Sequence, residues 1–189
     1  MTKEKILKAS YVLFSQKGFA STSITDIVKK SGLTKGALYH YFPSKDELFI
    51  QVLLFIHEHY ALNDIFALSH VTKSQYKKCL LNVGYKIIDL YQKDKYFSNF
   101  LWEMHAQIKK NPKIRKRVQQ ESQLQKEIFH EYIQKGIELG VFGAKPDIEY
   151  IGFKLKAALD SICLHLHVQL SCLDMKTMWE KVVNEVLSK

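Results

Sequence analysis

Apolar residues recur three or four positions apart along most of the chain, which is the spacing of an α-helix with one buried face. The alternation of apolar and polar residues that marks a half-buried strand is almost absent, and no Asn-Gly or Asp-Gly hairpin turn occurs. The three prolines, Pro43, Pro112 and Pro146, each lie between segments of helical period. The sequence therefore predicts an all-α fold of about nine helices.

Capping signals predict that the first three helices are short. The first runs over about residues 3–17 and stops at Gly18, and the second begins at Ser23, where SITD fits a capping box, and stops at Gly32. Only the turn GLT separates it from a third helix that begins after Thr34 and ends at Phe42-Pro43. A short turn with a glycine is typical of a helix-turn-helix.

The later helices are longer and more apolar. A second capping box, SKDE, starts the fourth helix at Ser44. A seventh helix is expected from Pro112 to near Gly140, and an eighth after Asp147. We therefore expect a small three-helix domain in residues 1–47, followed by a larger helical domain in residues 48–189.

Composition limits the classes of partner. The chain has 189 residues, 47% of them hydrophobic, which is enough to bury a core and argues against disorder. Lys and Arg number 28 against 19 Asp and Glu, a formal charge of +9. A polyanion or an anionic surface is therefore an expected partner, although charge alone does not choose between them.

Cysteine usage and hydropathy indicate the compartment. Cys79, Cys163 and Cys172 are too few and too odd in number for a disulfide framework, which favours a reducing environment and buried thiols. The segment MTKEKILKASYVLF has lysines among its apolar residues, so it fits an amphipathic helix rather than a signal sequence. Other apolar runs fall short of the roughly 20 residues of a membrane span. We expect a soluble, cytoplasmic protein with no membrane partner.

The stretch GLTKGALYHYFPSKDEL carries the most specific chemistry. The second helix of a helix-turn-helix places its N-terminal residues in the DNA major groove, and no carboxylate occurs from Thr34 to Ser44. Lys35 is expected to donate to a guanine or a phosphate, Gly36 to let the backbone approach, and Ala37 to touch a thymine methyl group. The residues expected to donate to phosphate oxygens are Tyr39, His40, Tyr41 and Lys45.

The segment GFASTSITDIVKKSGLTKGALYHYFPSKDEL resembles the DNA-binding region of the TetR family of transcriptional regulators. The glycine-aromatic turn, the Ser/Thr cap and the Tyr-x-x-Phe-x-x-Lys ending carry the resemblance, which covers about a quarter of the chain. It implies a DNA-facing position for Ser23 and Thr34, beside Lys35, Tyr39, His40 and Lys45. Thr25 stands where some members have a base-reading arginine, so base readout from the second helix is expected to be weak.

The same resemblance implies a dimeric, ligand-responsive C-terminal part. The eighth helix is apolar on nearly every face from Ala157 to Leu170, so it must be buried on more than one side. It and the ninth helix are expected to form a homodimer interface, although both could instead complete a monomeric core. The expected interface residues are Ile151, Leu155, Leu159, Ile162, Leu166, Met178, Val182 and Val186.

An aromatic, soft-walled interior indicates a site for a small apolar effector. An aromatic stripe at helical spacing is also typical of plain core, and both interpretations stay open. The candidate effector residues are Trp102, Met104, His105, Phe129, Tyr132 and Phe153.

Other functions fit parts of the sequence. Cys163 and His167 share a helix face, so a metal-sensing or thiol-sensing regulator is an alternative, but His165 points elsewhere and no Cys-x-x-Cys supports it. The basic run KKNPKIRKR at residues 109–117 fits a second nucleic-acid patch or a solvated turn. A sequence-neutral architectural DNA-binding protein would also explain the charge, but not the large apolar C-terminal part.

Catalytic motifs are missing from the sequence. It contains no Gly-x-Ser-x-Gly elbow, no phosphate-binding glycine loop and no His-Glu-x-x-His pair. We expect no enzymatic activity and no cofactor. The sequence favours a repressor that binds a near-palindromic operator as a homodimer and is released by a small hydrophobic effector.

Overall fold

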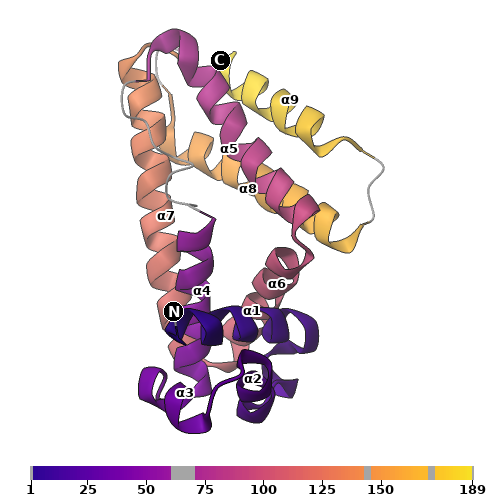
Figure 1. Ribbon diagram of the computed structural model, residues 1–189. Helices are drawn as coiled ribbons and strands as arrows, with labels where there is room; N and C mark the ends of the chain where they lie inside the picture. The colour runs from indigo at the N-terminus through magenta and orange to yellow at the C-terminus, as the bar shows by residue number, and fades with distance from the viewer. Residues whose placement is uncertain (1, 61–70, 143–145, 170–172, 189) are drawn as a thin grey trace. The chain divides into compact units, whose positions relative to one another are not determined.

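The computed structural model describes residues 2–60, 71–142, 146–169 and 173–188 (Figure 1). All regular structure within these ranges is helical, which confirms the predicted fold class. The described helices are α1 (Thr2–Ser21), α2 (Ile24–Ser31), α3 (Lys35–Tyr41), α4 (Lys45–His59), α5 (Lys73–Lys93), α6 (Lys95–Lys110), α7 (Pro112–Glu138), α8 (Ile148–Val168) and α9 (Met175–Leu187).

The helices form two compact units. The first unit contains α1 to α4, α6 and the start of α7, and the second unit contains α5, the rest of α7, α8 and α9. Neither unit is continuous in sequence. The predicted domains, residues 1–47 and 48–189, are divided by expected function and do not correspond to these two units. That division stays a prediction.

Caps fix the boundaries of the short helices, as predicted. The Ser23 hydroxyl accepts from the Asp26 backbone N–H at 3.0 Å and the Asp26 carboxylate accepts in return from Ser23, which completes the capping box of α2. Gly32 ends α2 in the left-handed conformation, with φ 69° and ψ 23°. The Thr34 hydroxyl accepts from the Ala37 N–H at 3.1 Å and starts α3.

Gly18 interrupts α1 near its end. Its φ of 77° and ψ of 164° lie in a region that only glycine adopts without strain, so the helical path is broken there. The predicted stop at Gly18 is confirmed as a kink inside the helical segment. A Cβ at this position would also lie 3.0 Å from the Glu103 carboxylate of α6.

Aromatic side chains fill the core of the first unit. The Phe49 ring stacks on Phe100 with ring centroids 4.8 Å apart, and Phe14 lies 5.2 Å from Phe49. Leu38 and Phe42 are fully buried and anchor α3 in this core. The short α3 is therefore held by packing, because seven residues are too few for a stable isolated helix.

Asp94 joins three elements of the first unit. Its Oδ1 accepts from the Tyr96 and Phe97 N–H groups at 2.7 and 3.3 Å, which caps α6. Its Oδ2 accepts from the Tyr11 hydroxyl of α1 at 3.2 Å and from the hydroxyl of Tyr60 at the end of α4. Burial and the bond to Asp94 raise the pKa of Tyr60 to about 12.

The second unit packs around Trp179. Its indole is fully buried and donates to the Leu81 carbonyl at 3.1 Å. A Cβ at Gly84 would overlap this indole, so the glycine allows α5 and α9 to approach closely. Tyr76 is also fully buried and donates to the Tyr132 carbonyl at 2.9 Å.

Candidate nucleic-acid interface

Two helices and a three-residue turn build the candidate interface. The N–H groups of Gly32 and Leu33 both donate to the Val28 carbonyl, at 3.1 and 3.3 Å, which closes the end of α2 before α3 begins. Leu38 holds the inner face of α3 against the first unit. The outer face of α3 is left to face solvent.

That outer face is aromatic, small and basic. Lys35, Gly36 and His40 are exposed, and the Tyr39 and Tyr41 side chains are 50% and 41% exposed. Large aromatic side chains are more often buried than exposed, so this pair needs an explanation. Hydroxyl, ammonium and imidazole donors without a neighbouring carboxylate suit an anionic partner, and phosphate oxygens accept from all of them.

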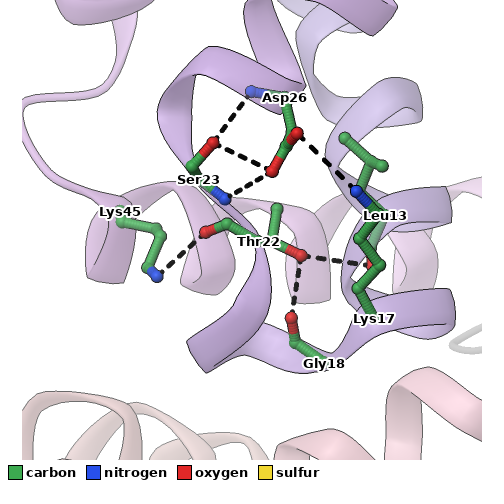
Figure 2. Close-up of polar contacts among 7 residues, drawn as sticks. All are labelled: Leu13, Lys17, Gly18, Thr22, Ser23, Asp26 and Lys45. Carbon is green, nitrogen blue, oxygen red and sulfur yellow. Dashed lines mark hydrogen bonds and ion pairs between the residues drawn. The ribbon is translucent and has the colours of Figure 1, made fainter.

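At the start of α2, the polar groups of Ser23 and Asp26 are engaged in capping the helix. Figure 2 shows the Ser23 hydroxyl and backbone bound to the Asp26 carboxylate, which also lies 3.6 Å from the Lys17 ammonium. The hydrogen bonds from Ser23 hold the pKa of Asp26 below its ordinary value. The Ser23 side chain therefore shapes the helix end, whereas the Thr25 side chain is exposed.

Lys45 has a structural role that its sequence position does not reveal. Its ammonium donates to the carbonyl oxygen of Thr22 at 3.0 Å (Figure 2). It also donates to the Phe19 carbonyl oxygen at 2.8 Å and lies 4.4 Å from the centre of the Phe19 ring. These contacts tie the start of α4 to the turn between α1 and α2. Because an ammonium has three N–H donors, one remains for a phosphate.

The family model for bacterial regulatory proteins of the tetR family matches residues 6–52. Through this region, the chain is similar to regulators of the TetR family. A curated relative, the HTH-type transcriptional regulator YuxN of Bacillus subtilis (strain 168), is 44% identical over 57 residues. That alignment covers 30% of this chain and 20% of YuxN, so the likeness is confined to the DNA-binding region.

Solved structures extend the likeness to the whole fold. The regulator FadR from Bacillus subtilis, solved with stearoyl-CoA, matches with a TM-score of 0.78 at 18% identity, over 98% of this chain and 97% of that one. A regulator from Saccharomonospora viridis, solved with choline, matches with a TM-score of 0.77 at 17% identity, over 98% of this chain and 95% of that one. At these identities the likeness concerns the fold alone.

The candidate effector residues are divided between the units. Trp102, Met104 and His105 lie on α6 in the first unit, where Met104 is buried and the other two are exposed. The other three lie in the second unit. Of these, Phe129 and Phe153 line a cavity of about 430 Å³ between α7 and α8, whereas Tyr132 is buried in the core.

The cavity between α7 and α8 is mainly apolar. Ile133, Ile148 and Ala157 line it with the two phenylalanines, and charged groups stand around it. The Lys126 ammonium lies 3.3 Å from the Glu149 carboxylate, which is an ion pair between the two helices. This arrangement suits a ligand that is largely hydrophobic.

The candidate dimer-interface residues mostly lie inside the protein's own core. Leu155, Leu159 and Ile162 are at most 5% exposed, so their face of α8 is covered within one chain. The remaining five are buried or half-buried: Ile151, Leu166, Met178, Val182 and Val186. The exposed large hydrophobic side chains of α8 are different residues, namely Tyr150, Phe153, Leu164 and Val168.

The thiol and histidine cluster is not assembled as a sensor in the residues described. Burial raises the pKa of Cys163 to about 12, which keeps the thiol protonated. His165 Nδ1 lies 2.7 Å from the Ser161 carbonyl oxygen, and burial lowers the pKa of His167. Cys172 lies outside the described residues. Across the described ranges, no three His, Cys, Asp or Glu side chains gather in a way that could hold a metal ion.

Two features of the first unit carry no short-range sequence signal. The carbonyls that bind Lys45 come from residues 26 and 23 positions earlier. Asp94 lies 83 positions from Tyr11 and 34 from Tyr60.

Among the helices described, none combines the length and the hydropathy that a membrane span requires.

Proposed function

We propose that this chain is a transcriptional repressor that acts in the cytoplasm as a homodimer on a near-palindromic DNA operator, and that a small hydrophobic effector releases it. The observation that carries the proposal is the exposed outer face of α3, which presents Lys35, Tyr39 and His40 in a stretch, residues 34–44, that contains no Asp or Glu. Such a face suits insertion of α3 into the major groove, with α2 and the start of α4 against the flanking phosphates.

Selection of genomic DNA fragments on the purified protein tests this function. Wild-type protein should retain one recurrent near-palindrome at physiological salt, because two reading helices one helical turn apart require repeated half-sites. The Lys35→Ala variant should retain a relaxed set of sequences, since it removes a base contact and keeps the fold.

The controls separate this function from its alternatives. Tyr39→Phe removes one hydroxyl and should weaken binding to all sequences about equally, because a hydroxyl that binds phosphate reads no base. Retention of arbitrary fragments by wild type, with strong salt dependence, would instead identify a sequence-neutral architectural protein.

The cavity between α7 and α8 is the proposed effector site. Its volume of about 430 Å³ lies within the range of small-molecule sites, and its walls are mainly apolar. Phe129 and Phe153 line it, which supports two of the six residues proposed from sequence.

A fluorescent hydrophobic probe tests the cavity. Anilinonaphthalene sulfonate should bind wild-type protein with a blue-shifted emission and should bind Ala157→Phe much more weakly, because the larger side chain would occupy the cavity that Ala157 lines. Ala20→Phe, an exposed site in the first unit, is the control. Equal probe binding by Ala157→Phe and wild type would remove the cavity from consideration.

A further inference from the structure

The turn between α6 and α7 carries a concentration of positive charge that the proposed operator contacts do not use. Residues 109–117, KKNPKIRKR, contain six Lys and Arg and no Asp or Glu. Lys109, Lys110, Lys113 and Lys116 are exposed. Across the residues described, no carboxylate lies within ion-pair distance of these four lysines.

Local bonds hold this turn in one conformation. The Asn111 side-chain oxygen accepts from the N–H groups of Lys113 at 3.0 Å and Ile114 at 3.3 Å, which caps α7. The Arg115 guanidinium donates to the carbonyls of Ile108 at 2.8 Å and Lys109 at 3.1 Å, which closes the end of α6. The lysines therefore lie on a turn whose backbone is fixed by hydrogen bonds.

Packing attaches the turn to the unit that carries α2 and α3. Ile114, near the start of α7, is 1% exposed and lies in the first unit. The outward lysines of α7, Lys113 and Lys116, are three positions apart and so share a face of the helix. Their face turns away from the core that Ile114 enters.

The course of α6 leads the turn toward the candidate interface. Near its start, the Tyr96 carbonyl accepts from the Ser15 hydroxyl at 3.0 Å, and seven residues later Glu103 lies against Gly18, just before α2. Lys109 follows Glu103 by six residues, a rise of about 9 Å along the helix. Figure 1 shows the turn between α6 and α7 at the end of the first unit where α2 and α3 lie.

We infer that the α6–α7 turn is a second DNA-contacting surface, which binds the phosphate backbone that flanks the operator. Duplex DNA carries one charge per roughly 1.7 Å of its axis, so phosphates continue on either side of the sequence that α3 reads. The inference rests on the proposed function, because α3 must bring the duplex to this unit. The turn adds affinity without base readout, since lysines that meet phosphates carry no sequence information.

A membrane surface is a poorer match for this turn. Basic segments that bind bilayers present large apolar side chains beside their charges. Here the large apolar side chain of the α7 start, Ile114, is buried in the protein core. The exposed residues of the turn include its lysines and Arg115, which offer charge without an apolar face to insert.

Binding to duplexes of two lengths tests the inference. The short duplex is the recurrent sequence recovered by fragment selection, and the long duplex adds about ten base pairs, one helical turn, on each side. The test variant is Lys113→Gln with Lys116→Gln. The matched control is Lys77→Gln with Lys78→Gln, two exposed lysines of α5 in the second unit, which removes the same charge.

Wild type and the control should bind the long duplex about tenfold more tightly than the short one at about 0.1 M salt. The test variant should bind both about equally, and its slope of log affinity against log salt on the long duplex should fall by about 0.9 for each phosphate that it no longer neutralises. Lys113→Arg with Lys116→Arg keeps the charge and should behave as wild type.

The outcomes distinguish this inference from the function on which it rests. A test variant that keeps both the length effect and the wild-type salt slope would overturn the flanking contact alone. If wild-type protein shows no preference for the selected sequence over other DNA, the proposed function as a sequence-specific regulator is overturned. Binding to phosphatidylglycerol vesicles is measured for the same proteins. If the test variant loses vesicle binding that wild type shows, and keeps the length effect on DNA, the turn binds membranes and the inference is overturned.

Discussion

At the scale of single residues, the first unit depends on side chains whose partners lie far away in sequence. Lys45 closes the α1–α2 turn by two hydrogen bonds to backbone carbonyls and stands over the Phe19 ring. A lysine at this position therefore contributes to the fold as well as to phosphate binding. The two contributions predict different results for Lys45 and for Lys35, which is exposed.

Lys45→Ala should lower both the free energy of unfolding and the affinity for DNA. Removal of charged hydrogen bonds costs about 1–2 kcal/mol at a partly exposed site, and affinity should fall for all sequences alike. Urea unfolding and fluorescence anisotropy measure the two effects. Lys35→Ala is the control and should change DNA binding only; an unchanged unfolding midpoint in Lys45→Ala would contradict the structural role.

Two glycines of the first unit should respond in opposite ways to substitution. Gly18→Ala should destabilise the fold by about 1–3 kcal/mol, because a Cβ is strained at φ 77° and meets Glu103. Gly36→Ala should leave the fold stable or raise its stability by up to about 1 kcal/mol, since Gly36 is helical and open. It should nevertheless weaken DNA binding, because its methyl group separates the backbone from the groove. Thermal unfolding and anisotropy on the same samples check both.

The tyrosines around Asp94 predict an alkaline limit to stability. Folded Tyr60 keeps its proton up to a pKa of about 12, whereas an unfolded tyrosine loses it near 10. The folded state therefore binds more protons between these values, and the free energy of unfolding should fall as the pH rises from about 10 to 12. Tyr60→Phe should show a shallower fall in urea titrations, and Tyr41→Phe, at an exposed site, should match wild type.

At the scale of helices, the sequence predicted those helix ends that are fixed by residues close in sequence. The cap at Ser23 and the glycine stop at Gly32 depend on residues within three or four positions, and each lies where it was expected. Which face of α8 is buried depends instead on α5 and α9, which pack against it from other parts of the chain. Sequence could not decide this, because α8 is apolar nearly all round.

Close helix packing in the second unit gives a prediction at the same scale. Gly84→Ala should destabilise this unit by about 1–3 kcal/mol, since the added Cβ overlaps the Trp179 indole and forces α5 and α9 apart. Tryptophan fluorescence during urea unfolding, measured in a Trp102→Phe background, reports on Trp179 alone. Asn82→Ala, at an exposed site of α5, is the control and should leave the midpoint within about 0.5 kcal/mol of wild type.

At the scale of the whole molecule, the proposed homodimer needs an exposed apolar surface, and α8 offers one through Leu164 and Val168, each 42% exposed. Leu164→Glu with Val168→Glu should raise the dimer dissociation constant at least tenfold in sedimentation experiments, because charges would have to be desolvated at the interface. Leu159→Ala, at a buried site, should lower stability and leave the association less affected. A double variant that still sediments as wild type would place the interface elsewhere.

The discontinuity of the first unit limits how this protein can be recombined. A hybrid regulator made by joining residues 1–47 to an unrelated C-terminal part would leave out Phe49, Asp94 and Phe100, which complete the core around α1. Exchange of DNA specificity should therefore succeed more readily by replacing the exposed side chains of α3 than by transplanting the segment. The part of this chain that can be exchanged is therefore the exposed surface of α3 and not a continuous segment of sequence.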